Sequence, residues 1–286
     1  MLCILYVNAV GALLAAVGVL TERFLPAMLA RRWIWCAVIV TSLFLPGYYR
    51  GHHNMPMTAW WASTESYDTV INRLWLSLSA ALIVWSVASM SRVSYLVNAS
   101  RKRGANGSTP TIVDGIPVVV TDSLGPATVG LLRSRVLVPH WVLALPRMQR
   151  RYVLRHEEEH RRAHDARLLF VASLPIVLIP WNIAMWWQLR RLCLAVEIDC
   201  DNRVVSTLGD PTAYGELLLK VAQAASRGPR LQPALLGGMG SLEHRLTVLL
   251  APTPLRHLQR FVLPLAVCAL LVIVLMMPHP ILHAGQ

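Results

Sequence analysis

Long apolar blocks constrain this chain more than any other feature of its sequence. They occupy residues 2–21, 33–49, 74–97 and 261–277, and a helix of roughly 17–25 residues is enough to cross the hydrocarbon core of a bilayer. Composition agrees, because only 15% of the residues are charged, against about 25% in an average soluble domain. We therefore expect a mostly α-helical integral membrane protein with about four transmembrane helices.

Arginines between these blocks indicate how the chain is oriented in the membrane. The net charge of +12 is gathered around residues 23–32 and in the long polar region 99–260, and basic loops favour the cytoplasmic side. The N-terminus, the loop 50–72 and the tail after the last block are then outside the cell. No motif that reads nucleic-acid bases accompanies the charge, so we expect a multi-pass plasma-membrane protein without direct nucleic-acid binding.

Three regions follow from this arrangement. We expect an N-terminal membrane region with three spans at 1–98, a cytoplasmic-facing domain at 99–260, and a last span with a short extracellular tail at 261–286. Inside the middle region, residue patterns predict a few short strands, at 115–122 and 134–139, and a helix at 146–167.

The predicted helix at 146–167 carries the pattern His156-Glu157-x-x-His160. Its two histidines lie one turn apart on one face, so both imidazoles can reach one metal ion. Glu157 is offset from that face and can instead take a proton from the attacking water. The pattern predicts a zinc-dependent peptidase with Zn²⁺ on His156 and His160 and with Glu157 as the catalytic base.

A surface helix without any metal is the alternative interpretation. The run of glutamates at 157–159 has arginines at 155, 161 and 162 within one turn, and such pairs stabilise an exposed helix. A third metal ligand on the same side of the membrane would favour the peptidase.

Glu197 is the best candidate for that third ligand, because a catalytic zinc takes three protein ligands and a water. It stands four residues before Asp201, so the two carboxylates share one face of a helix. Asp201 can then orient a ligating histidine through its second ring nitrogen. An ordinary acidic helix start is the alternative.

The apolar stretch 168–189 bears on whether these ligands can meet. A full crossing of the bilayer would strand Glu197 on the opposite side from the two histidines. Pro175, Pro180 and Asn182 mark a break where a helix can turn back. We therefore expect a re-entrant helical hairpin that brings the three ligands together on the cytoplasmic side.

Other residues near the motifs receive simpler interpretations. His164 lies two turns from His156, too far along a straight helix to share its ion, so we expect it to support the site from outside or to be exposed. His52 and His53 fit a solvated loop. We interpret Cys200 as a small buried residue. Tyr152 and Arg203 are candidates for stabilising the oxyanion, which only geometry can decide.

The order of these motifs can also be compared with known proteins. His156-Glu157-x-x-His160 is followed by Asp165, by Pro180-Trp181-Asn182 and by Glu197-Ile198-Asp199-Cys200-Asp201. Residues 125–130 (GPATVG), 136–139 (VLVP) and 242–246 (LEHRL) flank them. Over roughly residues 115–250 this combination resembles the BlaR/MecR family of bacterial beta-lactam sensor-transducers and their relatives.

The resemblance implies a gluzincin-type peptidase facing the cytoplasm, with zinc on His156, His160 and Glu197 and with Asp165 and Asp201 supporting the ligands. In such systems a signal received outside releases proteolysis of a protein substrate inside, often a helix-turn-helix repressor. Because only residues 278–286 follow the last apolar block, we expect no C-terminal penicillin-binding sensor. Another protein or the loop 50–72 would then do the sensing, or activity would be constitutive.

Two alternatives to this function remain. A housekeeping peptidase resembling the HtpX and CAAX prenyl protease group would also combine His-Glu-x-x-His with Glu-x-x-x-Asp. A catalytically silent membrane scaffold would keep the zinc for structure alone. The hairpin and the short strands upstream of the first motif favour the regulatory peptidase.

Overall fold

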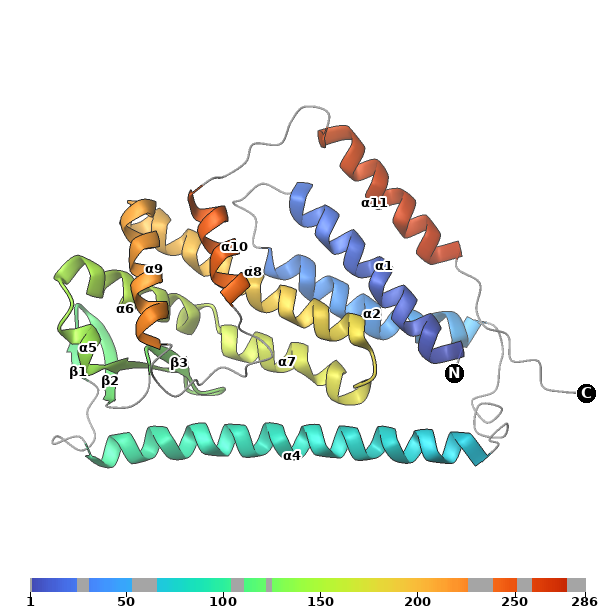
Figure 1. Cartoon of the computed structure of the whole chain (residues 1–286), viewed down its shortest axis with the longest axis horizontal. Helices are drawn as coiled ribbons and strands as arrows, with labels where there is room; N and C mark the ends of the chain where they lie inside the picture. The colour runs from blue at the N-terminus through green and yellow to red at the C-terminus, as the bar shows by residue number, and fades with distance from the viewer. Residues whose placement is uncertain are drawn as a thin grey trace, which may run out of the picture. The chain divides into compact units, whose positions relative to one another are not determined.

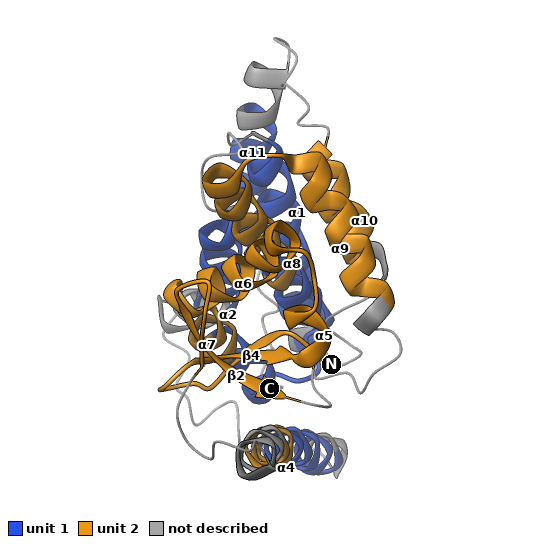
Figure 2. Cartoon of the chain, turned by 90° about the vertical axis from the view of Figure 1, so that its left-hand side faces the viewer, with its two compact units in different colours: residues 1–85, 172–192, 254–286 blue, residues 86–171, 193–253 orange. Residues whose placement is uncertain are grey.

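A computed structural model describes most of the chain, and within the described residues the protein is mostly helical with one small sheet (Figure 1). The chain forms two compact units, coloured separately in Figure 2. Unit 1 comprises residues 1–85, 172–192 and 254–286, and unit 2 comprises residues 86–171 and 193–253. The described residues are 2–24, 31–52, 66–103, 111–121, 125–225, 239–250 and 259–276.

Unit 1 contains the apolar helices of the chain. Helix α1 (Leu2–Phe24) packs against α2 (Arg32–His52) and α11 (Gln259–Met276). Among the described residues, two stretches are long and apolar enough to cross a membrane, Ile4–Arg23 in α1 and Asn72–Arg92 in α4. The apolar parts of α2 and α11 are shorter, so the four-span arrangement stays a prediction.

Helix α4 (Ser66–Arg103) is longer than the third apolar block. It begins inside the loop that the sequence places at 50–72, because polar residues extend the helix beyond the apolar stretch at both ends. Its Trp75 indole donates a hydrogen bond to the carbonyl of Leu178 at 2.8 Å within unit 1. Residues 50–52 of that loop belong to α2, so His52, expected in a loop, is instead the last residue of this helix. Residues 53–65, including His53, lie outside the described residues.

Helices α7 (Asp165–Leu178) and α8 (Ile183–Leu208) follow each other through a turn at residues 179–182. The turn falls at Pro180 and Asn182, as the sequence predicts, whereas Pro175, also predicted to mark the break, lies inside α7. The Asn182 side chain accepts a hydrogen bond from the backbone nitrogen of Met185 at 3.1 Å, which caps the first turn of α8. Together the two helices extend beyond the predicted hairpin 168–189 at both ends, and each contributes residues to both units.

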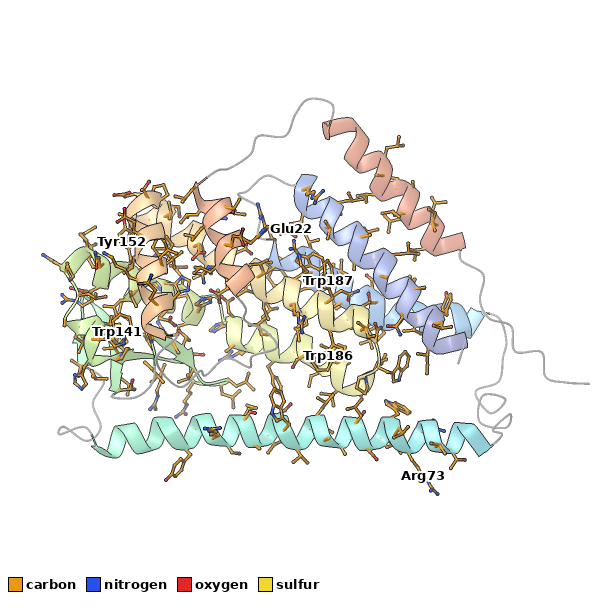
Figure 3. The ribbon with its side chains drawn as sticks, viewed as in Figure 1. Glu22, Arg73, Trp141, Tyr152, Trp186 and Trp187 are labelled. Atoms are coloured by element: carbon orange, nitrogen blue, oxygen red, sulfur yellow. The ribbon has the colours of Figure 1, made fainter. Side chains whose placement is uncertain are left out.

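The unit 1 part of α8 is attached to α1 by polar contacts. Gln188 is fully buried and donates to the carbonyl of Gly11 at 2.8 Å, and a Cβ at Gly11 would lie 2.9 Å from that of Ala184. At the end of α1, the buried Glu22 (labelled in Figure 3) pairs with Arg191. This guanidinium also lies over the Trp187 ring, 5.8 Å from its centroid, so the part of α8 that belongs to unit 1 is held against α1.

Unit 2 contains a four-stranded sheet in the order β1-β2-β4-β3. The central pair β2 and β4 is parallel, whereas β1 and β3 are antiparallel to their neighbours. The predicted strands correspond to β2 and β4, whereas β1 and β3 are not among the predicted strands. The strands are β1 (Thr111–Val113), β2 (Ile116–Thr121), β3 (Ala127–Val129) and β4 (Arg135–Pro139).

Asp114 and Gly115 explain why β1 pairs with β2. Both have positive φ, 48° and 83°, as a two-residue hairpin turn requires. An Asp-Gly pair between two β-branched runs is a known hairpin signal, so β1 can be predicted from the sequence.

Helix α6 (Arg147–Arg162) covers the sheet and packs against β3, β4 and α9 (Pro211–Ala225). The remaining helices of the unit are α5 (His140–Leu143) and α10 (Met239–Leu250), and α10 packs on α9. The core between these elements is formed by Val118, Val136, Val138, Tyr152, Leu154, Val204 and Leu217.

The prediction of one helix over 146–167 is wrong at its C-terminal end. Helix α6 stops at Arg162, and His164 takes a left-handed conformation with φ of 56°, which few residues other than glycine and asparagine adopt. A new helix, α7, then begins at Asp165. Without glycine or proline at the break, the sequence pattern did not reveal it.

Candidate metal centre

Two histidines on α6 and one glutamate on α8 place their ligand atoms around one point. The Nε2 atoms of His156 and His160 lie 3.1 Å apart, with the rings nearly perpendicular. The Glu197 carboxylate has one oxygen 3.6 Å from His156 Nε2 and the other 3.7 Å from His160 Nε2. All three residues belong to unit 2.

These separations suit a tetrahedral zinc ion. Ligand atoms about 2.0–2.1 Å from zinc lie about 3.3 Å from one another in that geometry, close to the 3.1 Å between the two Nε2 atoms. Each Nε2 also has one of the two Glu197 oxygens at 3.6 or 3.7 Å. Two imidazole nitrogens and one carboxylate also form a donor set typical of catalytic zinc, which leaves a fourth position open. The residues present therefore fit the ion that the sequence predicts.

Asp165 fixes the orientation of His160. Its carboxylate lies 2.8 Å from Nδ1 of His160 and is buried, so Nδ1 carries the proton and Nε2 keeps its lone pair. The break at His164 makes this contact possible, because it starts α7 with Asp165 turned back towards His160.

Tyr214 and Asp201 do the same for His156. The Tyr214 hydroxyl lies 2.9 Å from His156 Nδ1 and donates to Asp201 Oδ1 at 2.7 Å. Burial, and then the Asp201 carboxylate, raise the pKa of Tyr214 well above its usual value, so the hydroxyl keeps its proton. Its oxygen can then accept from Nδ1 of His156, which leaves Nε2 free to bind a metal.

Arg245 on α10 binds both carboxylates of α8. Its Nη1 lies 2.9 Å from a Glu197 oxygen, and its Nε and Nη2 donate to the two oxygens of Asp201, each at 2.7 Å. A planar guanidinium matches a carboxylate in this two-pronged way. Arg245 therefore ties the Glu197 and Asp201 carboxylates together beside the histidines.

The electrostatics of the pocket favour a bound cation. Burial would raise the pKa of Glu197, but Arg245 and the two histidines lower it below its usual range, so the carboxylate is charged. Burial would lower the pKa of His156, but Cys200 and Glu197 raise it to about 10. The pocket thus attracts a positive charge onto the imidazoles, which a metal ion can supply in place of a proton.

Glu157 follows His156 on α6 and is buried. Thr128 on β3 donates to Glu157 through one hydroxyl, 3.1 Å from the carboxylate Oε2 and 2.6 Å from the backbone carbonyl. The sheet therefore holds both the helix and the carboxylate of the predicted base.

Replacing Thr128 by valine tests this support. We expect a loss of about 0.5–1.5 kcal/mol in the free energy of unfolding, because one hydrogen bond is lost at constant shape, together with slower peptide hydrolysis at unchanged zinc content. Thr128→Ser keeps the hydroxyl and should restore both properties. Equal turnover in the valine and wild-type proteins would show that Thr128 does not position Glu157.

Replacing Tyr214 by phenylalanine tests the support of His156. We expect about 10–100-fold weaker zinc binding, because partners of ligating histidines contribute to metal affinity on this scale, measured by competition with a chromophoric chelator. Tyr152→Phe is a matched control, since its ring stacks on that of Tyr214 with centroids 5.3 Å apart. Equal affinities of the two variants would contradict the role of Tyr214.

Several other predicted positions can now be placed. His164, expected either to support the site from outside or to be exposed, is exposed. The Tyr152 hydroxyl (Tyr152 is labelled in Figure 3) donates to the carbonyl of Gly209 at 2.9 Å, and Arg203 binds Glu159 at 2.9 Å. Both groups offered for the oxyanion are thus engaged in other contacts.

The glutamate run behaves partly as the surface-helix interpretation expects. Glu158 accepts hydrogen bonds from Arg161 and Arg162, and Glu159 pairs with Arg155. The carboxylates of these glutamates are nevertheless buried, while their arginine partners reach the surface, with the Arg162 side chain 55% exposed. The pairs support the helix that carries the histidines.

Comparison with known proteins agrees with the resemblance seen in the motifs. Residues 53–249, well over half of the chain, match a family model described as BlaR1 peptidase M56. One curated relative, the "Regulatory protein BlaR1" of Bacillus licheniformis, is 26% identical over 111 residues. The match covers 38% of this chain but only 18% of that relative, so the chain spans a small part of the relative's length.

Proposed function

The chain belongs to the BlaR1 peptidase M56 family, and we propose that it is a membrane-embedded, zinc-dependent endopeptidase of the gluzincin type. The observation that carries the proposal is the convergence of two imidazole Nε2 atoms and the Glu197 carboxylate at separations of 3.1–3.7 Å. His156, His160 and Glu197 hold the metal, and Asp165 and Asp201 support them.

Each residue has a distinct part in the proposed hydrolysis. A zinc ion at this position supplies Lewis acidity that polarises the scissile carbonyl. Glu157 takes a proton from the attacking water and passes it to the leaving amine. Asp165 and Tyr214 keep both imidazoles in the tautomer that leaves Nε2 free, and Arg245 keeps Glu197 charged and oriented.

The substrate that we propose is a cytoplasmic regulatory protein, such as a helix-turn-helix repressor, or the chain itself. Support comes from the relative, which is named a regulatory protein, and from the arginines that flank the apolar helices and favour a cytoplasmic site in the plasma membrane. We propose the same organisation as the sequence predicts, with membrane regions at 1–98 and 261–286 and the peptidase domain at 99–260.

Zinc content and cleavage, measured together, test this function. Full-length protein purified in detergent should bind about one zinc ion, and His160→Ala should lose it. His164→Ala should retain it, because His164 is exposed and lies outside the donor set. In host cells, the protein N-termini that cleavage by the wild-type protein creates should disappear with His160→Ala and remain with His164→Ala. Equal zinc content in the three proteins would contradict the proposed metal site. Unchanged N-termini with His160→Ala would contradict the proposed peptidase activity.

A further inference from the structure

Cys200 is a sulfur donor at the edge of the metal centre that the proposed hydrolysis does not use. It is fully buried on α8, three residues after Glu197 and on the same face of the helix. Its Sγ lies 3.4 Å from Nδ1 of His156 and 3.3 Å from the His156 carbonyl. The thiol therefore lies beside Nδ1 of the imidazole, whereas Glu197 lies beside Nε2.

The distances suit a second set of ligands. One ligand atom from each of His156, His160 and Cys200 lies within 4.8 Å of the others. Zinc bonds of about 2.3 Å to sulfur and about 2.0–2.1 Å to nitrogen place the two donors about 3.6 Å apart in tetrahedral geometry. The separation of 3.4 Å between Cys200 Sγ and His156 Nδ1 is close to that value.

The two sets compete for the same imidazoles. In one, His156 offers Nε2 beside the Glu197 carboxylate; in the other, it offers Nδ1 beside the Cys200 sulfur. Because the first set uses Nε2 of His156 and the second uses Nδ1, one ion cannot satisfy them together. In the second set the ion replaces the Nδ1 proton that the Tyr214 hydroxyl, 2.9 Å away, otherwise accepts. Thiolate ligands are preferred by soft ions, so the nature of the ion decides between the sets.

We propose that the centre has a second coordination mode, through His156, His160 and Cys200, which thiophilic ions such as Cd²⁺ occupy and which excludes Glu197. The inference rests on the two histidines of the proposed function. Binding converts the thiol to a thiolate and releases its proton to solvent. An ion in this mode lies away from Glu197, so it blocks the hydrolytic arrangement.

Metal spectroscopy on the full-length protein in detergent tests the proposal. With one equivalent of Cd²⁺, the wild-type protein should show a near-ultraviolet sulfur-to-metal charge-transfer band. Cys200→Ser should bind the ion and lose the band. Cys193→Ser, on the same helix, should keep it, and so should Glu197→Gln, because the sulfur mode does not need that carboxylate. X-ray absorption of the wild-type complex, which requires no variant, should show a sulfur atom bound to the Cd²⁺ ion.

The outcomes separate this inference from the proposed function. If Cd²⁺ binds and X-ray absorption finds only nitrogen and oxygen neighbours, or if Cys200→Ser retains the band, the sulfur mode is overturned while the metal centre stands. If neither Cd²⁺ nor Zn²⁺ binds the wild-type protein, the proposed function and this inference both fail.

Discussion

Replacing Glu157 by glutamine is expected to slow peptide hydrolysis by about 10²–10⁴-fold, the usual contribution of a general base, while zinc content and thermal stability stay at wild-type levels. Glutamine keeps an oxygen that can accept from Thr128 but cannot take a proton from water. The measurement compares new protein N-termini in host cells carrying each version, after equal expression and equal zinc are established.

Glu243→Gln is the matched control, because Glu243 is exposed on α10 and undergoes the same chemical change. Its cleavage products should match those of the wild type. If Glu157→Gln also leaves every cleavage product unchanged under resting and cell-wall-stress conditions, the protein is a zinc-bearing scaffold and not a peptidase.

The second large effect is expected at Arg245. Arg245→Ala leaves the buried Asp201 and the half-buried Glu197 without the guanidinium that both contact, and breaking a buried pair in this way costs about 3–5 kcal/mol. We expect a clearly lower melting temperature of the metal-free protein in detergent. Added zinc should restore part of the loss, because an ion that binds only the folded protein stabilises it by mass action.

Two variants make this result specific. Arg162→Ala removes an arginine whose side chain is 55% exposed, and its partner Glu158 keeps Arg161, so the loss should stay below about 1 kcal/mol. Arg245→Lys keeps the charge but not the fork, and should fall between the alanine variant and the wild type. Equal melting of Arg245→Ala and wild type would show that the carboxylates do not depend on this arginine.

The sequence predicted those parts of the protein whose signal is local. The spacing of His156 and His160 requires only a helix, and the turn before α8 is marked by Pro180 and Asn182. In the same way, the β-branched runs of β2 and β4 identified two of the four strands. Each of these features depends on residues within a few positions of one another.

The remaining parts depend on contacts between distant segments. Thr128, Tyr214 and Arg245 reach the centre from β3, α9 and α10, and no periodicity indicates that they meet. The LEHRL segment, which includes Arg245, is marked in the sequence only by its resemblance to the BlaR/MecR family. The contact between Asp165 and His160 is likewise not predictable from the sequence pattern. It depends on the left-handed conformation of His164, which ends the helix although no glycine or proline is present.

The position of Arg245 near the end of unit 2 has a consequence for the newly made protein. A ribosome delivers the chain from its N-terminus, so His156, His160, Glu197 and Asp201 are all synthesised before the guanidinium that compensates the two carboxylates. A nascent chain that stops short of α10 holds two uncompensated carboxylates, which oppose closure of the pocket. Translation order thus delays assembly of the centre until α10 has been made.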